Sequence, residues 1–325
     1  MRVLFVTSNR LGDAILSTAV LARLLEERPD ARITVACGPV AATLFDSVPE
    51  VERVIAWRKE KGGRHWWTLW RQVAATRWDR VIDMRGSALA WTLRAGERRI
   101  YSTPRADGHR LDQMAAALGL EPPLSPRLWI AQTDSERAAA SLGTDHRPLL
   151  AVAPTANWPP KAWPGDRFVE LIDRLCAPDG PLPGARVLVA GGPGERELAA
   201  PVLAAVPSDR LIDLVDRAPL MALAAAFARC DLVVANDSGL MHLAAAAGAP
   251  TLGLFGPSRE VHYAPTGLTA AWVRAGERAD ALLARSDEAG GQPGALMAGL
   301  SVEAVETAAL SLLKASPNRK RPESA

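Results

Sequence analysis

Residues 233–258 read VVANDSGLMHLAAAAGAPTLGLFGPS, and this order of apolar, polar and small residues predicts the fold. The apolar runs 231–235 and 251–255 are typical of buried strands, and the segment 238–247 between them is typical of a short helix. Residues 237–239, an Asp-Ser-Gly tripeptide, fall where the first strand ends and the helix begins. In an open parallel sheet, ligands bind beyond the carboxyl ends of the strands. Because a helix N-terminus also offers free N–H groups to an anion, the stretch predicts a phosphate or nucleotide site.

The same alternation of strand and helix patterns runs along most of the chain. Strands are expected over residues 3–7, 32–36, 53–56, 80–83, 99–102, 149–153, 185–190, 231–235 and 251–255. Helices are expected over residues 13–28, 64–77, 111–118, 134–142, 166–176, 195–206, 219–229, 238–247 and 301–313. Such alternation predicts an α/β fold with parallel sheets and helices on both faces.

A stretch with several prolines, residues 119–148, interrupts this alternation and predicts an interdomain connection. We therefore expect two Rossmann-like domains, because 325 residues are enough for two hydrophobic cores. The first covers residues 1–147 with the connection included, and the second covers residues 148–315 with a C-terminal helix. Residues 316–325 are rich in proline and charge and are predicted to be a disordered tail.

The composition excludes several classes of protein. Net charge is only +2, so a general polyanion binder is not implied, and no nucleic-acid partner is expected. The three cysteines, at positions 37, 176 and 230, fit neither a zinc site nor a disulfide framework and are expected to be buried free thiols. No apolar run reaches the roughly 20 residues of a membrane helix. No signal-peptide pattern is visible, so a cytoplasmic location is expected.

The first predicted strand is followed by a turn whose residues 9–13 read NRLGD. A dinucleotide-binding turn has three glycines in the pattern G-x-G-x-x-G, and only Gly12 is present, which argues against a nicotinamide-dependent oxidoreductase. The pattern G-x-x-x-x-G-K-(S/T) is missing from the chain, which argues against a P-loop kinase or ATPase. Asp13 fits two interpretations, a helix cap or a carboxylate that takes part in the chemistry.

Other polar residues also follow predicted strands. The turn at the start of the second domain contains Thr155, Asn157 and Lys161. The next turn, GGPGERE over residues 191–197, has three glycines, which permit close approach of a ligand to the backbone. Its glutamates, Glu195 and Glu197, either hold ribose hydroxyls or are simply favoured at a helix N-terminus. Arg85, after the strand expected over 80–83, is either a surface arginine or a contact for a phosphorylated ligand.

Three motifs together resemble the pattern of glycosyltransferase family 9, the heptosyltransferases of the inner core of bacterial lipopolysaccharide. They are RLGDAILST at residues 10–18, KAWP at residues 161–164, and DSGLMHLAA followed by PTLGLFGP between residues 237 and 257. The motifs occur in the family's order. Ser238 replaces the more common threonine of the last motif, which keeps the hydroxyl.

The resemblance implies a GT-B architecture, in which two Rossmann-like domains face each other across a cleft. It implies an inverting, metal-independent transfer of heptose from ADP-heptose to the core of lipopolysaccharide, with no cofactor. The partners would be the nucleotide sugar and a lipid-linked core oligosaccharide, and the protein would make peripheral contact with the inner membrane. Alternatives are another nucleotide sugar or glycan acceptor, a nicotinamide-dependent oxidoreductase, or a nucleotide-binding module without activity.

The resemblance also assigns roles to residues. Asp13 would be the general base that takes the proton of the acceptor hydroxyl, and Gly12 and Arg85 would contact the acceptor. Lys161 would contact the donor diphosphate, and Glu195, or its neighbour Glu197, would hold the ribose. Further donor contacts would come from Thr155, Asn157, Asp237, Ser238, Gly239 and His242.

Overall fold

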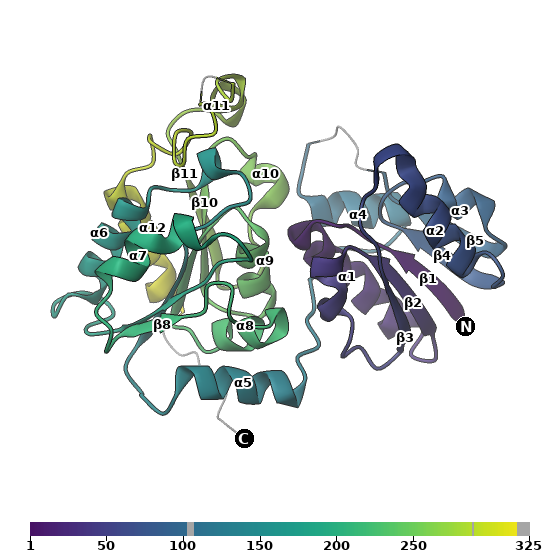
Figure 1. The fold of residues 1–325 in the computed structure, drawn as a ribbon, viewed down its shortest axis with the longest axis horizontal. Coiled ribbons are helices and arrows are strands. Elements are labelled where there is room, and N and C mark those ends of the chain that lie inside the picture. Colours follow the sequence, from purple (N-terminus) through teal and green to yellow (C-terminus); the bar gives the residue numbers. More distant parts are fainter. Residues whose placement is uncertain (103–106, 288, 317–325) are drawn as a thin grey trace. The chain divides into compact units, whose positions relative to one another are not determined.

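The computed structural model describes residues 1–102, 107–287 and 289–316, so the predicted tail lies outside the described residues from position 317 on. The chain divides into two compact units, unit 1 at Met1–Trp129 and unit 2 at Ile130–Ala325 (Figure 1). Each unit contains its own parallel sheet, so the expectation of an α/β fold with two parallel sheets is confirmed.

The sheet of unit 1 has five parallel strands in the order β3-β2-β1-β4-β5. Their bounds are β1 Arg2–Val6, β2 Arg32–Cys37, β3 Val51–Ala56, β4 Trp78–Asp83 and β5 Ala95–Ile100. The chain builds outward from β1 to β3 in one direction, and then adds β4 and β5 on the other side of β1. The strand order therefore reverses between β1 and β4, and the carboxyl ends of these two strands form the topological switch point, where open α/β sheets bind ligands.

The helices of unit 1 are α1 Leu11–Glu27, α2 Arg64–Val73, α3 Leu89–Thr92 and α4 Arg110–Leu118, with short 3-10 turns η1 Pro39–Leu44 and η2 Lys61–Gly63. The side chains of β1 point alternately to the two faces of the sheet, and different helices cover each face. Leu4 and Val6 point into a core that also contains Leu69 and Val73 of α2 and Leu89 of α3. Since successive strand residues face opposite sides, the intervening residues face the other side of the sheet, where α1 packs against α4.

The sheet of unit 2 has six parallel strands in the order β11-β10-β9-β6-β7-β8. Their bounds are β6 Leu149–Ala153, β7 Arg186–Val189, β8 Leu211–Asp213, β9 Leu232–Asn236, β10 Thr251–Phe255 and β11 Ala270–Arg274. Here the order reverses between β6 and β9. The sequence patterns anticipated the four central strands, whereas the edge strands β8 and β11 were not expected, because β8 is short and β11 is only half-buried.

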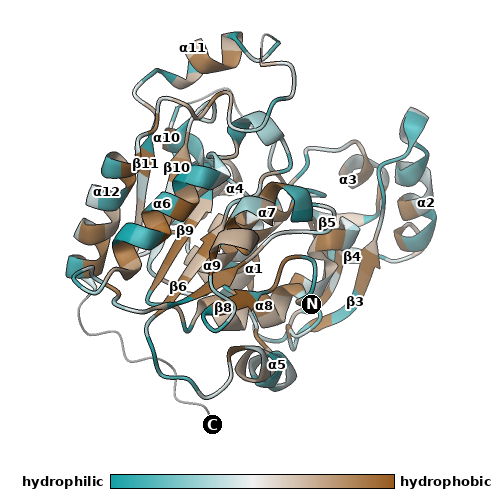
Figure 2. Cartoon of the chain, turned by 60° about the vertical axis from the view of Figure 1, so that its left-hand side comes forward, coloured by the Kyte–Doolittle hydropathy of each residue, from teal (hydrophilic) through white to brown (hydrophobic). Residues whose placement is uncertain are grey.

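The larger helices of unit 2 are α5 Gln132–Leu142, α6 Gly165–Cys176, α7 Arg196–Ala205, α8 Leu220–Phe227, α9 Gly239–Ala246 and α12 Val302–Ala315. The shorter elements are η3 Pro159–Lys161, α10 Glu260–Tyr263 and α11 Ala279–Ala284. One face of the sheet packs on α6, α7 and α12. The other face carries α8 and α9 (Figure 1). In Figure 2, α6 and α12 are banded teal and brown, as amphipathic helices on a sheet should be.

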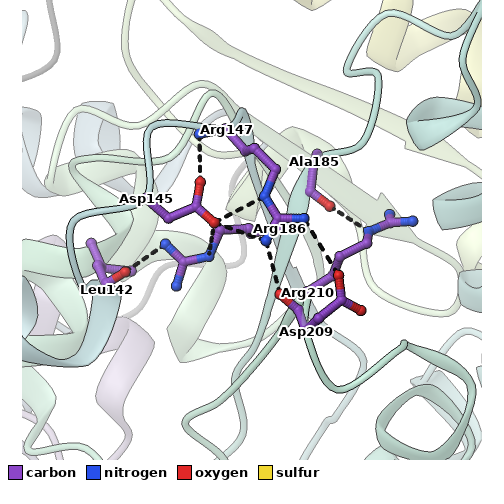
Figure 3. A network of polar contacts seen from close by, with 7 residues as sticks. All are labelled: Leu142, Asp145, Arg147, Ala185, Arg186, Asp209 and Arg210. Atoms are coloured by element: carbon purple, nitrogen blue, oxygen red, sulfur yellow. Dashed lines mark hydrogen bonds and ion pairs between the residues drawn. The ribbon is translucent and has the colours of Figure 1, made fainter.

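Helix α5 lies inside the stretch expected to connect the domains, but it packs on α8 and belongs to unit 2. The chain after α5 is fastened to the amino ends of the strands by a network of charges (Figure 3). The Arg147 guanidinium donates to Asp145, with Nε 2.9 Å from Oδ2, and to the carbonyl of Asp209 at 2.8 Å. Arg186 lies 3.6 Å from the same Asp145 carboxylate. The boundary between the units therefore falls at Trp129, before this helix.

The cysteines are as expected, since Cys37, Cys176 and Cys230 are all buried and free. Within the described residues, no helix is long and apolar enough to cross a membrane.

Candidate functional site

In unit 2, the switch point is held together by a buried side chain at the end of β9. Asn236 Oδ1 accepts the backbone N–H of Trp163 at 2.9 Å, and its Nδ2 lies 3.5 Å from the carbonyl of Ala153 and 3.4 Å from that of Thr155. One amide thus joins the end of β9 to the loop that follows β6. Sequence reasoning gave Asn236 no role, although an amide at the end of a buried strand requires such partners.

Lys161 and Asp237 meet at this point. The Lys161 Nζ lies 3.3 Å from Asp237 Oδ2, and the side chains are only 16% and 13% exposed. Two residues 76 positions apart in the sequence, both expected at the donor site, are therefore in contact. The ammonium has three N–H donors, so one can bind the carboxylate while the others remain available to an anion at the sheet edge.

The loop that carries Lys161 is buttressed by a segment far along the chain. Gly294 N donates to the Pro159 carbonyl at 3.1 Å, and Leu296 N donates to that of Pro160 at 3.0 Å. Gly256 leaves room for this segment, because a Cβ there would lie 2.8 Å from the Leu296 carbonyl oxygen. The Gly-Pro-Ser turn after β10 therefore shapes the site by admitting residues 294–297.

Trp163, the aromatic residue of the KAWP motif, is part of the core. It is 1% exposed, its Nε1 donates to the Leu300 carbonyl at 2.9 Å, and its ring meets that of Phe168 edge-on at 5.0 Å. Trp163 therefore fixes the end of the lysine loop by packing.

The N-terminus of α9 lies directly after Asp237. Ser238 is the N-cap in an extended conformation, with no hydrogen bond from its side chain to the helix, and Gly239 is the first helical residue. The Ser238 Oγ is buried and has no hydrogen-bond partner among the described residues. A buried hydroxyl without a partner is costly, and a helix N-terminus favours an anion. His242, one turn further on, is buried at 5% exposure.

The glycine turn after β7 is closed by Glu195. Its Oε2 accepts the hydroxyl of Thr155 at 2.5 Å and the backbone N–H of Gly192 at 2.8 Å. Glu195 therefore links the loops that follow β6 and β7, whereas Glu197 is exposed in the first turn of α7. Asn157 is exposed on the loop after β6.

In unit 1, Asp13 lies in the first turn of α1, close to the end of β1. The N-cap of α1 is Arg10, and no side chain caps this helix, so the structure does not show Asp13 as a cap. Ser8 Oγ donates to its carboxylate at 3.4 Å. Burial raises the pKa of Asp13 above its ordinary value, against the opposing charges of Arg10, Arg110 and Arg85. Gly12 precedes it within the same turn.

The other strand at this switch point, β4, ends in Asp83, which is fully buried. Its carboxylate accepts the backbone N–H groups of Arg85 at 2.8 Å and Ser87 at 2.9 Å, and the Ser87 hydroxyl. Burial raises the pKa of Asp83, and these hydrogen bonds oppose the rise. Asp83 thus shapes the turn that presents Arg85, a role that sequence reasoning missed.

Arg85 is exposed but held in place. Its Nη1 donates to Asn9 Oδ1 at 2.7 Å, which links the turn after β4 to the turn after β1. Its guanidinium carbon lies 5.3 Å from the ring centroid of Trp57 and 6.0 Å from that of Trp66, within cation–π range. Arg85 and Asp13 therefore flank one switch point.

Metal ligands do not gather in the described part of the chain, where no group of three His, Cys, Asp or Glu side chains is placed to hold an ion. At the switch point of unit 2, the structure instead places the Lys161 ammonium and the backbone N–H groups that begin α9.

Two doubly wound parallel sheets, each with charged residues at its switch point, are typical of the GT-B fold class. Residues 106–290, more than half of the chain, match the family model described as glycosyltransferase family 9 (heptosyltransferase). The chain belongs to this family and is a glycosyltransferase.

Two relatives that are named as heptosyltransferases match the chain in sequence. The chain is 23% identical over 330 residues to lipooligosaccharide heptosyltransferase 2 of Haemophilus influenzae, covering 90% of this chain and 93% of that protein. It is 32% identical over 151 residues to lipopolysaccharide heptosyltransferase 2 of Salmonella typhimurium, and this match covers 45% of this chain and only 42% of that protein.

Solved structures share the fold. A family 9 glycosyl transferase of Veillonella parvula aligns with a TM-score of 0.79 at 24% identity, covering 96% of this chain and 97% of that one. The ADP-heptose heptosyltransferase II of Escherichia coli aligns at 0.77 with 21% identity, covering 98% of this chain and 100% of that one. The E. coli heptosyltransferase WaaC solved with ADP aligns at 0.70 with 21% identity, covering 96% and 100%. These matches confirm the GT-B fold.

Proposed function

We propose that this chain transfers heptose from ADP-heptose to the inner core of lipopolysaccharide, with inversion and without a metal. The observation that carries the proposal is the Lys161–Asp237 pair beside the N-terminus of α9. The relatives support the choice of substrates, because several are named as lipopolysaccharide or lipooligosaccharide heptosyltransferases and one solved neighbour holds ADP.

The donor would bind to unit 2. Transfer leaves a nucleoside diphosphate whose negative charge develops as the glycosidic bond breaks, and preorganised donors stabilise such charge. We assign this role to Lys161 and to the N–H groups that begin α9 at Ser238 and Gly239. Asp237, already bound to Lys161, would meet sugar hydroxyls.

The nucleoside would lie toward the glycine turn. Glu195 would hold the ribose hydroxyls, because it lies at this turn and is only partly exposed, while Glu197 is exposed on α7. Thr155 would position Glu195 through the hydrogen bond between them. Asn157 and His242 are assigned to the donor by the family pattern alone.

The acceptor would be activated by Asp13. In an inverting transfer, the acceptor oxygen bonds to the anomeric carbon, the bond to the ADP oxygen breaks with its electron pair, and the base takes the hydroxyl proton. A carboxylate with a raised pKa is a better base near neutral pH than an ordinary one, which suits Asp13. Gly12 would allow close approach of the acceptor, and Arg85 would bind its anionic groups.

The acceptor is proposed to be a lipid-linked core oligosaccharide, so the protein would work at the surface of a membrane. The second candidate is a transfer with the same fold from another nucleotide sugar or to another glycan, since fold and site define the chemistry more firmly than the sugar.

The deciding experiment offers the purified protein a panel of ADP- and UDP-sugars with a core acceptor and follows nucleoside diphosphate release. ADP release from ADP-heptose alone, unchanged in EDTA, is the expected result. Preference for a UDP-sugar would overturn the donor assignment and leave the glycosyltransferase class intact. Loss of activity in EDTA that Mg²⁺ restores would overturn the metal-free mechanism.

A further inference from the structure

Two tryptophans of unit 1 are exposed, whereas others in the same unit are buried in its core. Trp67 of α2 is 61% exposed and Trp91 of α3 is 70% exposed, whereas Trp57 and Trp78 are nearly buried. Both short helices cover the same core cluster on one face of the sheet, so their outer sides belong to one surface of unit 1. Large aromatic side chains exposed on one face of a unit are typical of an interaction surface when charged residues surround them.

The buried side of α2 does not include Trp67. His65, Leu69 and Val73 are its buried residues, and they form the side that faces the sheet. Trp67 stacks on Trp70 with ring centroids 4.8 Å apart and planes only 12° from parallel. Trp70 is partly buried against the core cluster, so the stack runs from the edge of the core to the surface and fixes the Trp67 ring there, 61% exposed.

The charge around these rings is strongly positive. Residues 58–77 contain one acidic residue, Glu60, and six basic residues, whereas the whole chain has a net charge of only +2. The basic residues, all exposed, are Arg58, Lys59, Lys61, Arg64, Arg71 and Arg77. Tryptophan favours the level of lipid headgroups, and basic residues beside an amphipathic helix favour anionic lipid.

We propose that α2 and α3, with the basic segment before α2, form the surface by which unit 1 docks on an anionic lipid bilayer. Trp67 and Trp91 enter the headgroup layer, and the surrounding Lys and Arg side chains bind lipid phosphates. The inference locates the membrane contact that the proposed function calls for, and it does not depend on the sugar that is transferred.

The test is co-sedimentation of the full-length protein with vesicles of phosphatidylcholine alone or mixed with phosphatidylglycerol. We expect binding to the anionic vesicles only, weakened by salt. Trp67→Ser/Trp91→Ser should lower the partition coefficient roughly tenfold or more, as expected for lost interfacial aromatic area. Trp272→Ser is the matched control, because Trp272 is 45% exposed on β11 of unit 2 and should leave binding unchanged.

A second pair of variants tests the charge. Lys59→Glu/Lys61→Glu should reduce binding to anionic vesicles by about fivefold or more for each lysine replaced. The control is Arg278→Glu/Lys314→Glu, which makes the same charge change at exposed positions of unit 2. Circular dichroism and the thermal midpoint establish that each variant is folded.

Three results would overturn the proposal. These are the absence of binding to anionic vesicles, equal losses in the unit 1 variants and their controls, and binding to a single-stranded oligonucleotide in preference to vesicles. Transfer to a water-soluble acceptor fragment is measured in parallel. Its rate should be unchanged in Trp67→Ser/Trp91→Ser, so failure of the proposed chemistry is distinguishable from failure of the docking surface.

Discussion

The two units repeat one topology, yet their switch points differ in how charge is arranged. In unit 2, the lysine and the aspartate at the switch point form a pair, 3.3 Å apart, next to a helix N-terminus. In unit 1, Asp83 is fully buried and Asp13 is partly buried, both with raised pKa values, and Arg85, one of the cations near Asp13, is bound to a neutral amide. The difference teaches that the same sheet edge can be adapted in two ways. Paired donors suit it to the anion binding that we propose for unit 2, and a desolvated carboxylate suits it to the proton transfer that we propose for unit 1.

The largest expected effect concerns Asp13. Asp13→Ala should lower the rate of sugar transfer by about 10²- to 10⁴-fold, the usual contribution of a positioned general base. Donor affinity should change little, because the proposed donor residues lie in unit 2. Initial rates with ADP-heptose and calorimetry with ADP measure the two quantities. Transfer within tenfold of the wild type would leave Asp13 without a catalytic role.

Lys161→Ala tests the other side of the comparison. ADP affinity and turnover should both fall, each by about tenfold or more, because a charge-assisted contact to a diphosphate is lost and Asp237 loses its partner. Lys314→Ala, an exposed lysine on α12, is the control. Unchanged ADP affinity in Lys161→Ala would show that the diphosphate binds elsewhere.

The two glutamates after the glycine turn offer a matched pair. Glu195→Gln should weaken ADP binding by roughly three- to tenfold, because one hydrogen-bonded carboxylate is replaced by an amide in the turn. Glu197→Gln should have no effect, since this side chain is exposed on α7. If the two variants behave in the reverse way, the ribose contact belongs to Glu197. Calorimetric titration with ADP is sufficient.

A change in residues 294–297, the segment that supports the loop carrying Lys161, should have a smaller effect on donor affinity. Gly294 has φ +75°, and a Cβ there would lie 2.9 Å from Pro164 Cγ, whereas Gly291 has φ +79° and an open surrounding. Both alanine variants strain the backbone by roughly 1 kcal/mol, but only Gly294→Ala also displaces the loop that carries Lys161. Donor affinity should fall severalfold in Gly294→Ala alone. Equal affinities would show that the buttress does not position Lys161.

The smallest effect is on stability, and its sign differs between the units. Arg147 lowers the pKa of Asp145 in unit 2 to about 2, below its unfolded value of about 3.9. Its contribution is therefore present above that value and is lost as the pH falls toward 2. The pKa of Asp13 is raised instead, so the folded state binds this proton more readily than the unfolded chain does. Stability therefore declines as the pH rises from the unfolded value of about 3.9 through the raised folded pKa.

Two variants measure this contrast. Asp145→Asn should lower the urea midpoint at neutral pH, and the difference from the wild type should shrink below about pH 4, where the unfolded carboxyl protonates. Asp13→Asn should raise the midpoint at neutral pH, because it removes a desolvated charge. The same sign for both variants at neutral pH would contradict the opposite pKa shifts.

The sequence by itself determined the α/β class, the central strands and the three motifs. Buried parallel strands are continuous apolar runs, and polar residues after them fall at the carboxyl edge wherever the strand lies in the sheet. Lys161, Asp237, Ser238 and Asp13 could therefore be selected without coordinates. The KAWP tryptophan, the edge strands β8 and β11, and the assignment of α5 to unit 2 could not be read in this way, because each depends on packing between distant segments.

Only the tertiary structure decided which polar residues meet. Asn236 joins β9 to the lysine loop, Asp83 shapes the turn of Arg85, and Glu195 rather than Glu197 turns back to Thr155. It also decided that Asp13 is a desolvated carboxyl outside the cap position of its helix. The physical reason is the same in each case. Hydrogen bonds and desolvation depend on distances of a few ångströms between residues that are far apart in sequence, and a linear pattern does not contain these distances.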